Sequence, residues 1–107
     1  GSNLNLPMQA FAGDTDYINA IENKLIPAIQ KFNPDLIIIS AGFDAHENDP
    51  LAQIELSTEC YGKMTQQLLE AADNVCEGRV LSMLEGGYDY TALGDSVHLH
   101  VETLLNP

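Results

Sequence analysis

The run of apolar residues Leu36-Ile37-Ile38-Ile39 constrains the fold more than any other stretch of this sequence. β-Branched side chains favour strands, and a run without polar alternation is typical of a strand that is buried on both faces, as in a parallel sheet. We therefore expect a strand over residues 35–40. A second apolar segment, RVLSML at residues 79–84, predicts a second strand of the same kind.

A first helix is predicted before these strands, because apolar residues recur on one helical face from Ile18 to Phe32. Asp14 or Thr15 is expected to cap its start, and Asn33-Pro34 to end it. Pro27 lies inside the helix and lacks a backbone N–H, so we expect a bend there.

Two more helices follow the same pattern along the chain. The apolar face predicted for the first of them consists of Tyr61, Met64, Leu68, Ala72 and Val75. Ser57 is expected to cap the second helix, which Gly78 ends, and the last helix is expected to start at about Thr91. Residues 3–8, which are apolar at Leu4 and Leu6, are interpreted as the end of a further strand.

The resulting order of helix, strand, helix, strand, helix predicts an α/β fold with parallel strands joined by a crossover helix. A sheet of two or three such apolar strands is narrow. It needs helices on both faces and further strands at its edges, so the chain is not expected to form a self-contained domain.

The charge of the chain limits its partners. With 16 acidic and 4 basic residues among 107, the net charge is −12. Phosphate backbones are bound by clustered Lys and Arg, so nucleic acid is not an expected partner. The charge is compatible with a cationic substrate such as an amine, although an acidic surface also serves solubility alone.

Several features bear on where the chain is expected to work. The sequence contains neither a long apolar span nor a secretory leader, so neither a membrane location nor secretion is expected. Cys60 and Cys76 would lie ~24 Å apart on one helix, too far for a disulfide. Free thiols indicate a reducing, cytoplasmic location. Gly1-Ser2 is interpreted as a remnant of cloning.

Polar residues cluster after each predicted strand. Residues 42–50 hold Asp44, His46 and Asp49, and residues 85–90 hold Gly86, Gly87 and Tyr88. The carboxyl ends of adjacent parallel strands share one edge of the sheet, so these residues are candidates for one site.

The residue types suit one another chemically, but each also has a simpler interpretation. The Asp44 carboxylate can ligate a divalent metal, and the Tyr88 phenol can donate to developing negative charge. Two glycines allow close approach of a ligand to the backbone. Alternatively, Asp44 caps a turn, the Gly-Gly pair is only a turn, His46 organises its loop and Tyr88 is an exposed aromatic residue.

Two long motifs add specificity to this arrangement. They are PDLIIISAGFDAHENDPLAQIELS at residues 34–57 and RVLSMLEGGYDYTALGDSV at residues 79–97. Together they closely resemble the carboxyl-terminal portion of the zinc-dependent histone deacetylase family. The similarity is greatest to its class II-like members, acetylpolyamine amidohydrolases and acetoin-utilisation proteins. It extends over almost the whole chain, residues 1–107, including the LP…GD..Y pattern at Leu6–Tyr17. It implies a partial arginase/deacetylase-type parallel sheet.

The resemblance implies a role for each candidate residue. Asp44 matches one of the three protein ligands of the catalytic zinc, and Tyr88 matches the tyrosine that polarises the acetyl carbonyl. Gly86 and Gly87 match the lining of the acetyl pocket. His46 and Asp49 fall within the motif as residues that support the site or organise its loop. The substrate implied for the whole domain is acetyl-lysine or an acetylpolyamine.

The same resemblance predicts that this chain is incomplete as an enzyme. The other two zinc ligands and the catalytic histidine pair of the family lie upstream of these motifs, and the only histidines here are His46, His98 and His100. We therefore expect no stably bound zinc and no catalysis from the chain alone.

The sequence also allows two alternatives to the enzyme interpretation. One is a non-catalytic α/β module that self-associates through its exposed sheet edge. The other is a dinucleotide-binding fragment, which is disfavoured because no Gly-x-Gly-x-x-Gly follows either strand.

Overall fold

The two predicted strands form a parallel sheet in the computed structural model, which describes residues 2–106. Strand β1 spans Ile37–Ala41 and strand β2 spans Val80–Leu84. Their register pairs Ile37 with Val80 and Ala41 with Leu84. Both strands therefore end together, at the edge where the sequence predicted a site.

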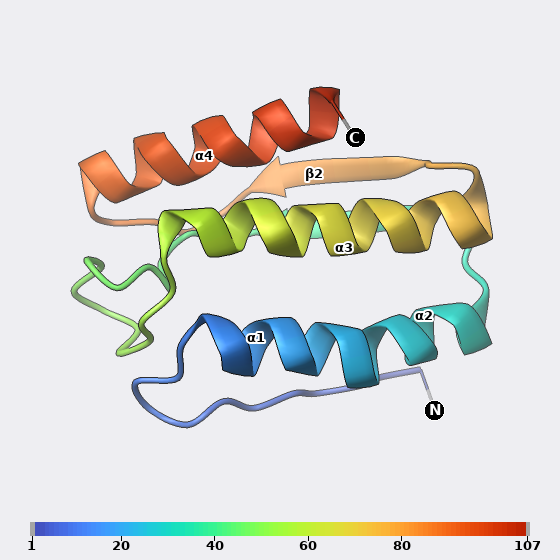
Figure 1. Ribbon diagram of the computed structural model, residues 1–107, viewed down its shortest axis with the longest axis horizontal. Coiled ribbons are helices and arrows are strands. Elements are labelled where there is room, and N and C mark those ends of the chain that lie inside the picture. Colours follow the sequence, from blue (N-terminus) through green and yellow to red (C-terminus); the bar gives the residue numbers. More distant parts are fainter. Residues whose placement is uncertain (1, 107) are drawn as a thin grey trace.

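The helices lie side by side along the sheet (Figure 1). Helix α3, Thr58–Cys76, connects the strands and lies between α4, Tyr90–Leu105, and the first helical segment. That segment consists of α1, Asp14–Ala20, a π-helical turn η1, Ile21–Leu25, and α2, Ile26–Phe32. The predicted order of helix, strand, helix, strand, helix is confirmed.

The expected disturbance at Pro27 takes the form of a widened turn directly before it. In η1 the Ile26 N–H donates to the Ile21 carbonyl, five residues back instead of four. Pro27 has no N–H to donate, so a π-turn here accommodates the missing bond while the helix continues.

The start of α3 is tied to the start of α1. Ser57 caps α3 as predicted, since its Oγ accepts the Cys60 N–H at 3.2 Å. Asp14 accepts from the Ser57 backbone N–H at 2.8 Å and from its hydroxyl. The prediction of Asp14 or Thr15 as the cap of α1 is wrong: Gly13 occupies the N-cap, and its N–H donates to Asp16. The Asp14 carboxylate instead accepts two hydrogen bonds from Ser57.

The strand suggested for residues 3–8 is also wrong, because these residues have no strand geometry. Neither β1 nor β2 pairs with this segment. Pro7 cannot donate a ladder hydrogen bond, and the Leu4 side chain is 51% exposed.

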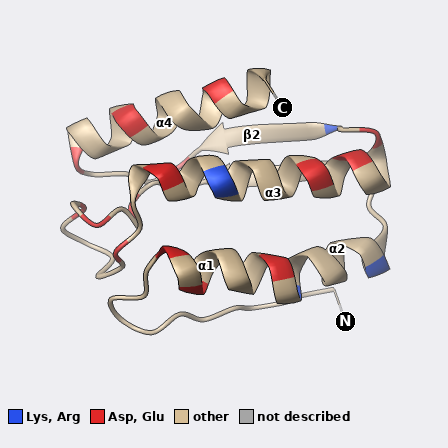
Figure 2. Cartoon of the chain, in the orientation of Figure 1, with Lys and Arg blue, Asp and Glu red and all other residues tan. Residues whose placement is uncertain are grey.

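Acidic residues occur on all the long helices, and basic ones are few (Figure 2). No helix within residues 2–106 has both the length and the apolar character to cross a membrane. Cys60 and Cys76 are free thiols, as predicted, and both are buried. Burial, together with the nearby Asp14, raises the pKa of the Cys60 thiol to about 12, which keeps it protonated.

The hydrophobic core lies between the helices and one face of the sheet. Its buried residues are Ala41, Phe43, Leu56, Cys60 and Tyr61.

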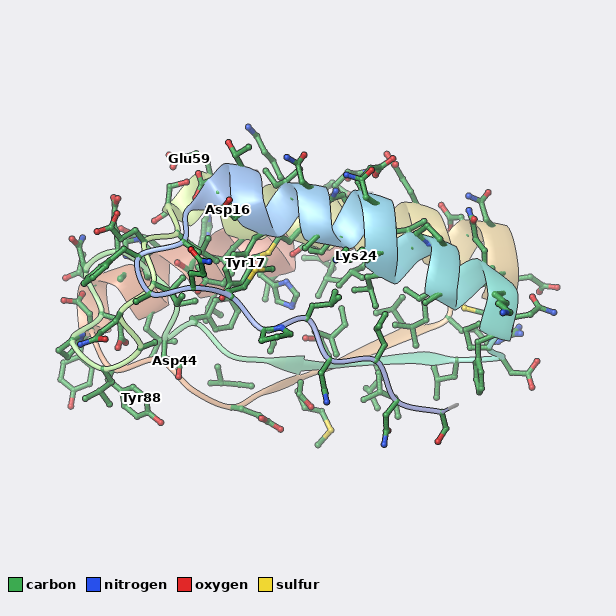
Figure 3. The ribbon with its side chains drawn as sticks, turned by 90° about the horizontal axis from the view of Figure 1, so that it is seen from below. Asp16, Tyr17, Lys24, Asp44, Glu59 and Tyr88 are labelled. Atoms are coloured by element: carbon green, nitrogen blue, oxygen red, sulfur yellow. The ribbon has the colours of Figure 1, made fainter. Side chains whose placement is uncertain are left out.

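The opposite face of the sheet is open among the described residues, and Figure 3 shows the helices on one side of the strands only. Ile38 is 59% exposed, Leu81 50% and Met83 58%. The prediction of strands buried on both faces is therefore wrong for this chain, because no second layer of helices is present within residues 2–106 to cover them.

A buried histidine joins three elements of the fold. The Thr65 hydroxyl donates to the Tyr61 carbonyl at 2.6 Å, so the 2.7 Å contact between Thr65 Oγ1 and His100 Nδ1 requires His100 to donate. The Nε2 atom of His100 then accepts from the Ser82 hydroxyl at 2.8 Å. His100 on α4 thus links α3 to β2 as a neutral imidazole, and burial lowers its pKa from the ordinary 6.5.

This linkage predicts an acid-sensitive contribution to stability. The pKa of His100 is lower in the folded chain, so the unfolded chain binds more protons once the pH falls through about 6.5, and the free energy of unfolding decreases. His100→Leu should cost about 1–3 kcal/mol near neutral pH by leaving Ser82 unpaired, and should flatten the pH dependence. Urea unfolding at several pH values measures both effects.

The matched control is His98→Leu, because the His98 side chain is 79% exposed. It should leave stability nearly unchanged. An equal pH dependence in the His100 variant and the unmodified chain would contradict the assignment.

Candidate functional site

The loops that follow β1 and β2 are held together by backbone hydrogen bonds beyond the strand ends. The Glu85 N–H donates to the Ala41 carbonyl at 3.0 Å, and the Phe43 N–H donates to the Gly86 carbonyl at 2.8 Å. The parallel pairing therefore continues into both loops. It brings the predicted candidates of the two loops together at one end of the molecule.

Asp44 lies between two glycines, one from each loop. A Cβ atom on Gly86 would lie 3.0 Å from Oδ1 of Asp44 and 3.2 Å from Oδ2, and a Cβ on Gly42 would lie 3.1 Å from Oδ1. These distances are shorter than normal van der Waals contacts, so the carboxylate occupies space that the missing side chains leave open. Gly42 was not among the predicted site residues, although it belongs to the same motif.

Tyr88 follows a glycine that no other residue can easily replace. Gly87 has a φ of 140°, and a Cβ there would lie 2.6 Å from Cδ1 of Leu93. Gly87 therefore packs closely against α4. The next residue, Tyr88, is 55% exposed. Figure 3 shows Asp44 and Tyr88 at the same end of the molecule.

Asp49 joins the two loops through its side chain. Its Oδ2 accepts the Tyr88 backbone N–H at 2.8 Å, and its Oδ1 accepts the Leu51 N–H at 3.0 Å. The residue is 8% exposed, so both oxygens are used within the protein.

His46 is buried, and both of its ring nitrogens are engaged. Nδ1 accepts the Asn48 backbone N–H at 3.1 Å, so Nε2 carries the proton and donates to the Thr58 hydroxyl at 2.9 Å. In this arrangement His46 shapes the loop and anchors it to α3, and it offers no nitrogen to a metal.

Two tyrosines near Asp44 were missed as site residues. Burial raises the pKa of both the Tyr17 and Tyr61 hydroxyls above 10.0, and the negative charge of Asp44 raises them further. The Tyr61 hydroxyl is buried without a hydrogen-bond partner among residues 2–106. Tyr61 follows the helical period of α3 and was therefore assigned only to the apolar face of that helix. For Tyr17 the sequence did contain a signal, because this residue ends the GD..Y pattern of residues 13–17 at the start of α1.

The loops around Asp44 are acidic. No Lys or Arg occurs in residues 32–62 or 80–107 of the sequence, and Figure 2 shows the loops at this end with acidic but no basic segments. Within residues 2–106, no three His, Cys, Asp or Glu side chains are grouped closely enough to hold a metal ion. A catalytic zinc site has three protein ligands, so Asp44 is not part of a complete one among the described residues.

Comparison with known proteins matches residues 1–104 to the model of the histone deacetylase domain. The chain is 40% identical over 97 residues to the chloroplastic histone deacetylase 14 of Arabidopsis thaliana, covering 91% of this chain and 23% of that protein. It is 41% identical over 106 residues to the human polyamine deacetylase HDAC10, covering 98% of this chain and 15% of that protein.

Solved structures agree with the predicted fold. The crystal structure of the HDA15 HD domain superposes with a TM-score of 0.82 at 38% identity, over 91% of this chain and 26% of that one. The structure of the histone deacetylase Clr3 gives the same TM-score at 36% identity, over 91% of this chain and 16% of that one. The partial arginase/deacetylase-type sheet predicted from the sequence is confirmed. The chain spans about a quarter or less of the length of these proteins.

The contacts of the glycines predict different effects of three alanine substitutions. Gly87→Ala should destabilise the chain by about 1–3 kcal/mol, because of its positive φ and the Leu93 contact. Gly86→Ala should cost a similar amount by displacing the Asp44 carboxylate. Gly94→Ala on α4 meets no atom within 4 Å and should stabilise by about 0.5–1 kcal/mol through helix propensity.

Chemical denaturation of the three variants measures these differences, with Gly94→Ala as the matched control. If all three substitutions changed stability equally, the close contacts at Gly86 and Gly87 would not be those described.

Proposed function

This chain belongs to the histone deacetylase family, and we propose that it supplies one side of a zinc-dependent deacetylase centre. In the proposed site Asp44 is one protein ligand of the zinc, and the Tyr88 hydroxyl faces the substrate carbonyl. Gly86 and Gly87 line the pocket for the acetyl group. The remaining ligands and the catalytic histidines would come from the rest of a complete domain.

The observation that carries the proposal is the contact between the two loops. The Asp44 carboxylate packs on Gly86, two residues before Tyr88, and the Phe43 N–H donates to the Gly86 carbonyl. The proposed metal ligand and the proposed phenol donor thus lie at one end of the sheet, within the residues that match the histone deacetylase domain.

Each residue has a distinct chemical task in the proposed site. The zinc of the complete domain would polarise the amide carbonyl and activate water. The Tyr88 hydroxyl would donate a hydrogen bond to the carbonyl oxygen as negative charge develops on it. Gly86 and Gly87 would line the acetyl pocket with backbone atoms alone, because the space a side chain would need at each is filled by Asp44 and Leu93.

The proposed substrate is an acetylated amine, either acetyl-lysine or an acetylpolyamine. The net charge of −12 and the absence of Lys and Arg from residues 32–62 and 80–107 support a substrate whose remaining groups are cationic. The same charge argues against nucleic acid as a partner. The cytoplasmic location stays a prediction.

Substitutions at the two principal residues should separate metal binding from catalysis in a complete protein that contains this chain. Asp44→Asn should remove zinc and activity together, because a neutral amide is a weak zinc ligand. Tyr88→Phe should retain zinc but lower kcat by about 10²–10³-fold, through loss of the donor to the oxyanion. Metal analysis and steady-state assays on acetyl-lysine and acetylpolyamine substrates measure both quantities.

Tyr90→Phe is the matched control, since Tyr90 lies two residues further on and is 89% exposed. It should turn over normally. Unchanged turnover in Tyr88→Phe would remove Tyr88 from the proposed mechanism.

The open face of the sheet favours a second candidate for the isolated chain, a non-catalytic module that self-associates. Ile38, Leu81 and Met83 expose apolar surface on adjacent strands. Covering such a patch with a second copy would remove it from water, at about 25 cal/mol for each Å² buried.

For this candidate we expect the 107-residue chain to form dimers without stoichiometric zinc or deacetylase activity. Leu81→Lys on the open face should dissociate the dimers, whereas Leu105→Lys, at an exposed position on α4, should not. Sedimentation velocity and metal analysis test both statements. One zinc per chain together with turnover, or a monomeric chain, would rule out the second candidate.

A further inference from the structure

Asp49 differs from the other acidic residues of the loops because its carboxylate is buried and hydrogen-bonded within the protein. It is 8% exposed, and its two oxygens accept two backbone N–H groups. One of these groups, that of Leu51, lies in the same loop. The other belongs to Tyr88, 39 residues further along the chain.

The hydrogen bond to Tyr88 lies where local structure does little to fix the backbone. Gly87 immediately precedes it with a φ of 140°, a conformation that other residues rarely adopt, and glycine itself does little to restrict the backbone. The Tyr88 side chain is largely exposed, so packing contributes little to fixing it. A buried carboxylate that accepts the Tyr88 N–H is a strong constraint, since hydrogen bonds to charged groups are about twice as strong as neutral ones.

The loop that carries Asp49 also carries Asp44, and hydrogen bonds connect the residues between them. The Asp49 N–H donates to the His46 carbonyl at 2.9 Å, and His46 is itself held by Asn48 and Thr58. Asp44 and Asp49 therefore belong to one loop that hydrogen bonds hold together. Two of its carboxylates contact the second loop, Asp44 at Gly86 and Asp49 at Tyr88.

We propose that Asp49 is a positioning residue, which sets the place of the Tyr88 hydroxyl relative to Asp44 through the Tyr88 backbone. The inference rests on the proposed function, because it concerns the same site. Asp49 itself would contact neither substrate nor metal. It acts by fixing the backbone from which the Tyr88 side chain extends.

Asp49→Asn tests this with a small change of shape. An amide places its oxygen at the position of only one of the two carboxylate oxygens and a donating NH₂ group at the other, so one of the two N–H groups loses its acceptor. In a complete protein that contains this chain, kcat should fall by about 10- to 100-fold with little change in KM, as expected when a reacting group is misplaced. Asp95→Asn, at an exposed position on α4, should leave both constants unchanged.

A double-mutant cycle separates positioning from a general structural effect. If Asp49 acts through the Tyr88 hydroxyl, Asp49→Asn should cause no further loss of turnover in a Tyr88→Phe background. An equal loss in both backgrounds, or no loss in the single variant, would overturn the proposal.

Hydrogen exchange of the Tyr88 amide gives a result that does not depend on turnover. Asp49→Asn should accelerate this exchange, and Asp95→Asn should not. Unchanged exchange would also overturn the proposal. If Tyr88→Phe alone proved harmless, the proposed function would fail at Tyr88, whereas the exchange result would still report whether Asp49 holds the Tyr88 backbone.

Discussion

The parallel pairing of β1 and β2 is the constraint on which the site depends. The pairing ends with Ala41 opposite Leu84 and continues through the Glu85 and Phe43 amides into both loops. Asp44 and Gly86 meet because of this backbone register. A slip by one residue would turn the side chains of a strand to the opposite face and move the loops apart, so the contact is as secure as the ladder itself.

The chemistry of the Asp44 end follows from what surrounds the carboxylate. Glycines on two sides leave it room, and two tyrosine hydroxyls nearby are kept protonated by burial and by its charge. No basic residue occurs in either segment that carries the loops. A carboxylate in such a setting has no cationic partner within its own loops, which suits a role as ligand to a cation supplied from outside the chain.

The strands, the cap at Ser57 and the two loops could be predicted because each leaves a local pattern: an apolar run, a capping residue, or polar residues after a strand. The contact between Asp49 and Tyr88 could not, since it joins residues 39 positions apart and depends on the conformations of both loops. The assignment of Tyr61 to the helical core was incomplete for the same reason. Periodicity identifies the buried face of a helix, but it does not show which buried hydroxyl lies near a carboxylate.

The open sheet face and the isolated position of Asp44, the proposed zinc ligand, have one explanation: the chain spans only about a quarter or less of its relatives. Ile38, Leu81 and Met83 are apolar, as expected for strands that are buried on both faces. Each of them is nevertheless at least half exposed. Burying one such side chain fully contributes about 1.5–3 kcal/mol relative to leaving it exposed. Covering this face would therefore strongly favour the folded, complete domain. In the proposed complete domain the segments that cover the face and those that complete the zinc site belong to the same polypeptide. Folding and metal binding would then be coupled, since the ligands come together only when the layers do.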